Sequence, residues 1–171
     1  MAGPERVLYR ERTGWAVWVD FIYWGVMAAV IMPVLLGGAG GATARGIVAV
    51  GLLCLFVLIH AVVGGLTVEV LRSGVRLGLG NGSLIRRWIG FSEIEGMEAV
   101  TYRPLLEFGG WGVRGWGRKK AWTARGNQAV VLHLREGRKL YVGSDNARRL
   151  EKRIRASWEA YRRTTGSCSD R

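Results

Sequence analysis

The chain has 171 residues, 49% of them hydrophobic, and it carries 25 Lys and Arg against 13 Asp and Glu, for a formal net charge of +12. A soluble nucleic-acid-binding domain this basic is usually hydrophilic, and a disordered basic segment would lack the eight tryptophans. Two cysteines and two histidines disfavour a disulfide framework or a zinc site with several ligands. The composition therefore indicates a basic protein with a separate, membrane-embedded part.

Two long apolar segments follow the first 14 residues. Residues 15–36 contain Asp20 as their one charged side chain, and residues 46–66 contain no Asp, Glu, Lys or Arg and a single histidine, His60. Each segment has the length that an α-helix needs to cross about 30 Å of hydrocarbon. The connection between them is short and rich in glycine, so the two helices are predicted to form an antiparallel transmembrane hairpin over residues 15–66.

Lys and Arg near the helix ends predict the orientation of this hairpin. Arg6, Arg10 and Arg12 precede the first helix, whereas Arg45 is alone in the loop, and more arginines follow the second helix. We expect a multi-pass protein of the cytoplasmic (inner) membrane with residues 1–14 and the C-terminus in the cytoplasm. An alternative is that the first segment is a cleaved signal peptide, because residues 42–44 (Ala-Thr-Ala) resemble a cleavage site. The length of the apolar stretch and the aromatic residues at its start argue against this alternative.

Asp20 and His60 are the two polar residues that interrupt the apolar segments. They lie 21 residues before and 19 residues after Gly41, at the centre of the loop. In an antiparallel hairpin this difference is an axial offset of about 3 Å, so the two side chains could meet at one depth. Three interpretations remain open: a structural pair, two independent residues at the membrane interface, and a site of proton or ion chemistry.

From residue 67 onward the chain carries 21 Lys and Arg against 10 Asp and Glu. Alternating apolar residues and turn signals such as Asn81-Gly82 predict seven short antiparallel strands. These strands are 66–71, 75–79, 84–89, 97–102, 119–123, 128–134 and 139–142. An amphipathic helix is predicted from about Asn146, with Ser144 or Asp145 as its cap. We therefore expect an α+β fold, with a seven-stranded barrel or sandwich and a C-terminal helix at 67–163, and a disordered tail at 164–171.

Four short motifs in this domain occur in a recognisable order. They are Tyr102-Arg103-Pro104-Leu105, Phe108-Gly109-Gly110-Trp111-Gly112-Val113-Arg114, Arg125-Gly126-Asn127 and Val142-Gly143-Ser144. Over residues 66–161 the chain resembles the bacterial pleckstrin-homology-like (PH-like) domain family. The resemblance implies a seven-stranded PH-like barrel closed by a helix, often placed behind membrane helices, and it implies little about activity. The loop at 72–76 has two arginines and no room for a pocket, so specific inositol-phosphate binding is not expected.

Catalysis and nucleotide binding find no support in the motifs. Residues 110–115 match the pattern G-x-G-x-x-G, but the residues that follow open a strand, whereas a dinucleotide site needs a helix there. His133 lies in a predicted strand, and Cys54 and Cys168 are far apart in the sequence. We therefore expect a non-enzymatic protein with no cofactor and no metal site.

The glycine-rich loop and the basic residues after it form the candidate contact patch. Its residues are Arg114, Trp116, Arg118, Lys119 and Lys120. Trp111 is expected to be a buried anchor, and Trp116 is the better candidate for an exposed contact. The expected partners are anionic lipid headgroups or an unknown protein. Specific nucleic-acid binding is not expected, because no readout motif is present.

These observations predict a membrane-anchored interaction or scaffolding domain that faces the cytoplasm. A simpler explanation of the charge is the positive-inside bias of membrane proteins. The alternative function is an oligomeric transport or proton-handling accessory that uses Asp20 and His60. It requires oligomerisation, because two helices per chain cannot enclose a pathway, and the sequence leaves the oligomeric state open.

Overall fold

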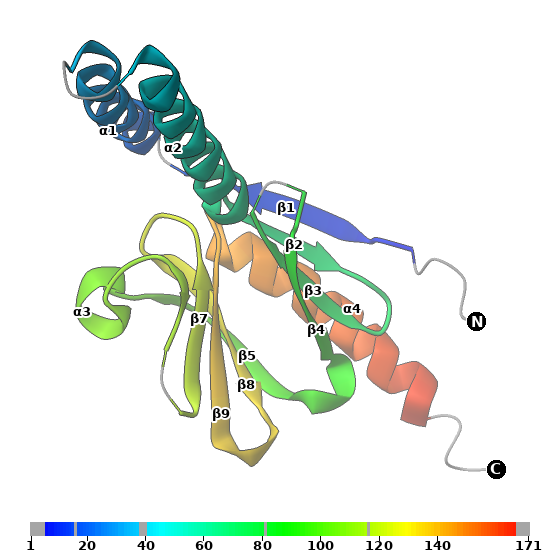
Figure 1. The fold of residues 1–171 in the computed structure, drawn as a ribbon. Helices are drawn as coiled ribbons and strands as arrows, with labels where there is room; N and C mark the ends of the chain where they lie inside the picture. The colour runs from blue at the N-terminus through cyan, green and yellow to red at the C-terminus, as the bar shows by residue number, and fades with distance from the viewer. Residues whose placement is uncertain (1–5, 16, 38–40, 81, 116, 167–171) are drawn as a thin grey trace.

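The computed structural model describes residues 6–15, 17–37, 41–80, 82–115 and 117–166. Figure 1 shows a long helical hairpin that rises from one end of a β-rich domain. The hairpin consists of α1 (Val17–Leu36) and α2 (Ala42–Val63). The strands on either side of the hairpin belong to the same domain, so the chain leaves this domain at α1 and returns to it at the end of α2.

By length and composition, both α1 and α2 could cross a membrane, over Trp18–Leu36 and Ala42–Ala61. Almost none of their side chains are buried in the domain, which distinguishes them from the core helix of a soluble protein. The helices contact each other through Tyr23, whose hydroxyl donates a hydrogen bond to the carbonyl of Phe56. α2 begins at Ala42 and ends at Val63, earlier at both ends than predicted. Gly64 and Gly65 end it, and Gly65 has a φ of +132°, which favours glycine.

The first sheet has four antiparallel strands in the order β1-β2-β3-β4. They are β1 (Tyr9–Thr13), β2 (Leu66–Val70), β3 (Gly74–Leu79) and β4 (Ile85–Gly90). β1 comes from the segment before the hairpin, where no strand was predicted. It pairs with β2, the strand that directly follows the hairpin, from Tyr9 opposite Val70 to Thr13 opposite Leu66. Residues 9–13 are therefore part of the domain.

The second sheet has five strands in the order β5-β8-β9-β7-β6, in which β7 and β9 are parallel and the other neighbours are antiparallel. They are β5 (Ile94–Thr101), β6 (Gly112–Arg114), β7 (Lys119–Thr123), β8 (Gln128–Leu134) and β9 (Arg138–Gly143). The helix α3 (Pro104–Phe108) and β6 occupy the region predicted as a long loop. Two single-turn 3₁₀ helices, η1 (Phe91–Glu93) and η2 (Arg135–Gly137), connect strands.

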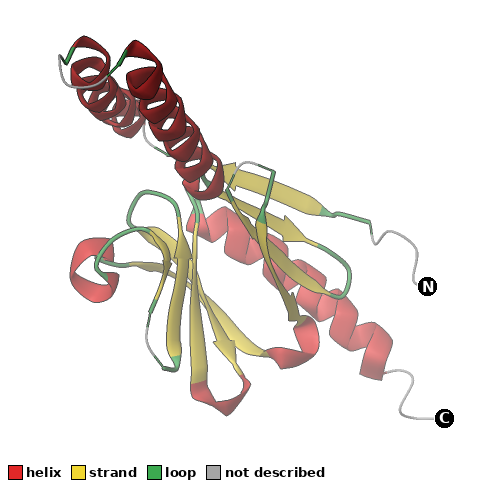
Figure 2. Cartoon of the chain, in the orientation of Figure 1, coloured by secondary structure: helices red, strands yellow, loops and turns green. Residues whose placement is uncertain are grey.

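The α+β class with two apolar N-terminal helices is confirmed, but the described residues form nine strands in two sheets where seven were predicted (Figure 2). Each of the seven predicted strands is present close to its predicted position. β1 was missed because Arg10, Glu11 and Arg12 are charged at consecutive positions, which hides the alternation of a strand. β6 was missed because its three residues lie among glycines.

The core lies between the two sheets and α4 (Ala147–Gly166). α4 directs Ala147, Leu150 and Ile154 into this core, as its three- and four-residue spacing predicts. Asn146 caps the helix, because its Oδ1 accepts a hydrogen bond of 3.0 Å from the backbone N–H of Arg149. The helix continues to Gly166, so residues 164–166 are helical, where a disordered tail was expected; residues 167–171 lie outside the described residues.

Three segments meet where α2 enters the domain, and we call this region the hairpin end. The N–H of Gly80, after β3, donates a hydrogen bond of 2.8 Å to the carbonyl of Gly65, just after α2. A Cβ on Gly65 would lie 3.0 Å from the carbonyl oxygen of Thr13, at the end of β1. The end of β1, the start of β2 and the turn between β3 and β4 therefore lie directly below the hairpin (Figure 1).

Candidate functional site

The structure separates the residues of the predicted contact patch. Trp116 lies outside the described residues, and the other four members are exposed. The far end of β7, at Thr123, lies against α1, where both line one groove. Lys119 starts the same strand, about 13 Å away at 3.3 Å per residue. Arg118, Lys119 and Lys120, which we call the distal basic cluster, are thus remote from the hairpin, whereas Arg114 lines the groove beside α1.

Trp111 anchors the glycine-rich loop. Its side chain is half-buried, and its Nε1–H donates a hydrogen bond of 2.9 Å to the carbonyl of Gly126 in the turn between β7 and β8. Gly109, Gly110 and Gly112 have φ angles of +69°, +124° and +111°. The glycines are therefore needed for the left-handed backbone conformation of the loop. The loop leads into the strand β6 and not into a helix.

Asp20 and His60 are neighbours in the hairpin. The Nδ1 of His60 lies 3.9 Å from Oδ1 of Asp20, which is beyond hydrogen-bond distance. The rings of Trp15, Tyr23 and Trp24 surround His60, with centroid separations of 6.2, 5.3 and 5.6 Å. The two polar residues therefore lie side by side between α1 and α2, next to a cluster of aromatic rings.

A further group of polar residues lies on the outer face of the first sheet. Cross-strand pairing places two rows of side chains on this face, because successive residues of a strand alternate between faces. The row nearer the hairpin end is Arg12, Thr67, Gly78 and Arg86, and the next row is Arg10, Glu69, Arg76 and Trp88. The opposite face carries the buried apolar residues of β2 and β3. The outer face therefore has four arginines and one carboxylate.

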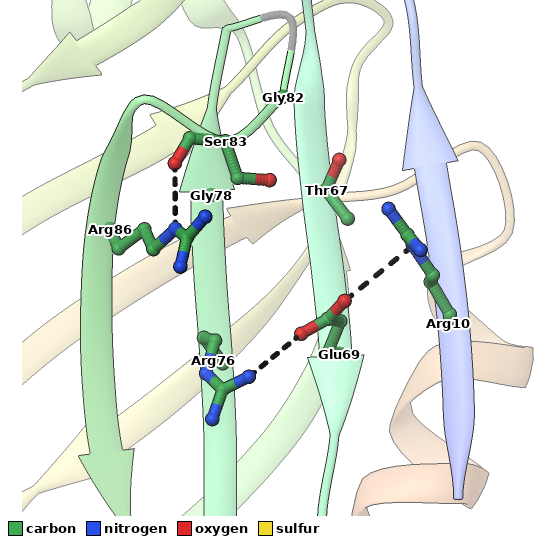
Figure 3. A pocket seen from close by; sticks show the side chains of 8 residues that line it. All are labelled: Arg10, Thr67, Glu69, Arg76, Gly78, Gly82, Ser83 and Arg86. Atoms are coloured by element: carbon green, nitrogen blue, oxygen red, sulfur yellow. Dashed lines mark hydrogen bonds and ion pairs between the residues drawn. The ribbon is translucent and has the colours of Figure 1, made fainter. Parts of the chain in front are cut away.

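Most of these residues line a cavity of about 280 Å³, which we call the arginine pocket (Figure 3). Its lining residues are Arg10, Thr67, Glu69, Arg76, Gly78, Gly82, Ser83 and Arg86. Glu69 lies between two guanidinium groups, 3.5 Å from Nε of Arg10 and 3.3 Å from Nη1 of Arg76. Nε of Arg86 donates a hydrogen bond of 2.9 Å to the carbonyl of Ser83. The lining holds three guanidinium groups and one carboxylate, so the pocket has a net positive charge.

Gly78 makes room for this pocket. A Cβ at position 78 would lie 2.3 Å from Oγ of Ser83, so only glycine lets that side chain lie over β3. Ser83 itself has a φ of +56°, which turns the chain tightly back toward β4. The small floor residue and the tight turn therefore leave an open, polar hollow between the arginines.

The pocket has the chemistry of an anion site at the hairpin end. Guanidinium groups bind phosphate and carboxylate oxygens with paired hydrogen bonds, and the hydroxyl groups of Thr67 and Ser83 can donate further bonds. Thr67 lies two residues beyond Gly65, and Glu69 lies four residues beyond it. The two rows are thus about 7 and 13 Å from Gly65, at 3.3 Å per residue.

The arginine pocket was not predicted from the sequence. Arg10 was used only as evidence for the orientation of the hairpin in the membrane. Arg76 was assigned to the loop at 72–76, which was judged too small to form a pocket. The pocket instead uses Arg76 as a strand residue and needs β1 to bring Arg10 beside Glu69. The signal available was the two-residue spacing of Arg10 and Arg12, which places both on one face of a strand.

Among the described residues, no group of three or more His, Cys, Asp and Glu side chains could hold a metal ion. The Nε2 of His133 lies 3.0 Å from Oε1 of Glu98, an ordinary cross-strand contact on the second sheet. Arg125 and Asp145 form a pair of hydrogen bonds of 3.0 and 2.6 Å, and this carboxylate raises the pKa of Arg125.

Comparisons with protein-family models and with curated proteins find no match to this chain. The resemblance to PH-like domains therefore stays a prediction that rests on the motifs.

Proposed function

We propose that this protein is a membrane-anchored, non-enzymatic interaction domain of the PH-like kind that faces the cytoplasm and binds anionic lipid headgroups. One observation carries the proposal: the arginine pocket lies at the hairpin end of the domain. Each basic residue near an anionic leaflet contributes about 1 kcal/mol of attraction. The nearer row lies about 7 Å from Gly65. In this proposal the headgroups reach Gly65, so the row lies within the Debye length of about 8 Å at physiological ionic strength and the attraction is only partly screened.

In this proposal the hairpin supplies the attachment, and the headgroup contacts orient the domain on the membrane. An anchored domain meets headgroups at a high effective concentration, so even weak binding in the arginine pocket holds one orientation. The distal basic cluster then points away from the bilayer, because it lies at the opposite end of β7 from α1. It is the part of the predicted patch that would meet a cytoplasmic protein partner.

The test measures how close the turn beside the pocket lies to the headgroups. Leu84 is 60% exposed next to Ser83, so Leu84→Cys provides a spin-label site in a chain with both native cysteines replaced. The full chain is placed in nanodiscs of phosphatidylcholine or phosphatidylglycerol, and power saturation reports the depth of the label. We expect the label to lie closer to the headgroups in phosphatidylglycerol than in phosphatidylcholine. High salt should remove this difference, because it screens the attraction.

The double variant Arg76→Gln/Arg86→Gln should abolish the difference between the two lipids. Its matched control is Lys152→Gln/Arg163→Gln, which removes the same charge from exposed positions on α4 and should preserve the difference. The proposal fails if the starting protein shows the same label depth in both lipids, or if the two double variants behave alike.

The second candidate function, an oligomeric transport or proton-handling accessory, is favoured by the 3.9 Å separation of Asp20 and His60. Ionisable side chains within membrane helices commonly serve ion or proton pathways. This function requires several copies of the hairpin around one path. A mass measurement in detergent that finds only monomer would exclude it, as would an Asp20→Asn variant with unchanged cellular phenotypes.

A further inference from the structure

A groove of about 580 Å³ separates the start of α1 from the loops of the second sheet. One wall consists of Trp15, which lies just before α1, and of Trp18, Val19 and Ile22 of α1. The opposite wall is formed by Gly110, Trp111, Gly112 and Arg114, by residues 123–126, and by Asp145. The groove is thus built jointly by a candidate membrane helix and by the domain.

The walls of this groove are apolar and its rim is cationic. Trp15, the three α1 side chains and Trp111 all present aromatic or branched aliphatic groups. Nε of Arg114 donates to the carbonyl of Trp111 at 3.3 Å, and Arg114 forms no ion pair with a carboxylate of the described residues. Arg125, also at the rim, is already neutralised by Asp145. Arg114 is therefore the cation available to an anionic occupant.

The position of the groove indicates which kind of ligand is close enough to bind in it. Trp18, Val19 and Ile22 lie in the first turns of α1, where the candidate membrane span begins. Tryptophan at the end of a membrane helix is typical of the headgroup region. A second hollow, which shares Trp111 and Gly126 with the groove, extends to Leu105 and Leu106 of α3, and these leucines are 66% and 77% exposed. The two hollows together thus continue from α1 to α3.

We propose that the groove binds one anionic phospholipid of the leaflet that contains the start of α1. An acyl chain lies against the α1 wall and Trp111, where it is removed from water, and the phosphate pairs with the guanidinium of Arg114. This site goes beyond the headgroup binding proposed above. It lies on the second sheet, uses none of the residues of the arginine pocket, and holds the lipid by its chain as well as by its charge.

The test uses the full chain in nanodiscs that contain phosphatidylglycerol with a diazirine in one acyl chain. After illumination, mass spectrometry maps the labelled residues. We expect labels in residues 110–114 and 123–126 in addition to those on the hairpin. An excess of unlabelled phosphatidylglycerol should remove the labels on the domain, and phosphatidylcholine should remove far fewer.

Two variants distinguish binding of the acyl chain in the groove from binding of the phosphate by Arg114. Val19→Trp fills the groove and should eliminate labels on the domain while the hairpin stays labelled. Phe21→Trp is its matched control, because Phe21 is 75% exposed on the same helix and does not line the groove. Arg114→Gln removes one charge-assisted contact and should reduce domain labelling about tenfold relative to the hairpin.

Three results would overturn the proposal. The first is a starting protein labelled on the hairpin alone, which needs no variant and so does not depend on folding. The second is equal labelling of the domain in Val19→Trp and Phe21→Trp. The third is equal competition by phosphatidylcholine and phosphatidylglycerol, which would exclude the anion contact at Arg114. None of these results depends on Arg76 or Arg86, so this site and the headgroup site can fail separately.

Discussion

At the scale of single residues, aromatic side chains stabilise the outer side of the second sheet. Phe108 of α3 lies between Tyr102 and Tyr141, with ring centroids 6.0 and 5.0 Å away. Trp111 follows in the same connection and ties the glycine-rich loop to Gly126. These contacts explain how a glycine-rich segment keeps a defined path: its rings and one indole hydrogen bond compensate for the flexible backbone.

The hydrogen bond of Trp111 can be removed with little loss of apolar volume. Trp111→Phe deletes the donor to the Gly126 carbonyl, and we expect the domain to lose about 1 kcal/mol of stability. Thermal unfolding of the full chain in detergent measures the change. The matched control is Trp88→Phe, at a 43% exposed position on β4, which should have a smaller effect. Equal melting temperatures for the two variants would contradict the anchoring role of Trp111.

Alkaline pH provides a second prediction at this scale. Burial raises the pKa of Tyr102 and of Tyr141 above the ordinary value of 10.0. As the pH rises, these hydroxyls therefore ionise in the unfolded chain before they ionise in the folded protein. Their contribution to the free energy of unfolding is complete below about pH 10 and is lost as the pH rises through the folded-state pKa. We expect the melting temperature to fall between about pH 9 and pH 11. Tyr102→Phe should make this fall shallower; an unchanged pH dependence in that variant would refute the assignment.

At the scale of elements, β1 connects the segment before the hairpin to the rest of the domain. It pairs with β2 along its whole length, and Glu11 also reaches the start of α4. One carboxylate oxygen of Glu11 accepts hydrogen bonds from the hydroxyl of Ser144, at 2.6 Å, and from the N–H of Asp145, at 3.2 Å. The element that was missed in the sequence is thus held by backbone pairing and by one carboxylate, with few apolar side chains.

Glu11→Ala should therefore weaken the attachment of β1. It removes the acceptor for the Ser144 hydroxyl and the Asp145 N–H, and we expect a loss of about 1–3 kcal/mol. Thermal unfolding measures the loss, and hydrogen exchange should show increased opening of residues 9–13. Glu95→Ala, at an exposed position of β5, is the control for loss of a carboxylate and should change stability by less than about 0.5 kcal/mol. Unchanged exchange in β1 would contradict the role of Glu11.

At the scale of the whole molecule, the sheet pairing places both ends of the hairpin in one domain. β1 directly precedes the hairpin in the sequence and β2 directly follows it, and the two strands are hydrogen-bonded neighbours. A hairpin that crosses a membrane would therefore hold the domain and the segment before α1 on one side. The excess of Lys and Arg in the domain favours the cytoplasmic side.

Labelling of cysteines in intact cells tests this topology. In a chain with both native cysteines replaced, Gly41→Cys lies in the loop of the hairpin, and Lys120→Cys lies in the distal basic cluster. We expect an impermeant maleimide to label position 41 in intact cells, and position 120 only after the membrane is opened. Labelling of position 120 in intact cells would reverse the orientation, and labelling of both would exclude a spanning hairpin.

The order of elements could be predicted from the sequence because it depends on local signals. Apolar runs of 20 residues, two-residue alternation and three- to four-residue spacing indicated both long helices, seven strands and the buried face of α4. The count of strands and the sheet order could not be predicted in the same way. β1 carries three charges in a row, and the parallel pairing of β7 with β9 joins segments that are not consecutive in the chain.

The sequence by itself determined the division of this protein into an apolar hairpin and a basic domain, because hydrophobicity and charge are properties of residues and need no neighbours. It also predicted that Asp20 and His60 can lie at one level of an antiparallel hairpin, because helix rise converts residue counts into length, but it left open whether they interact. The tertiary structure alone decided the two candidate sites. Arg10, Glu69 and Arg76 meet only when β1 pairs with β2 and β2 pairs with β3. Trp18 and Trp111 line one groove only when the fold brings the start of α1 beside the loops of the second sheet. Such sites depend on contacts between distant segments, which local patterns do not encode.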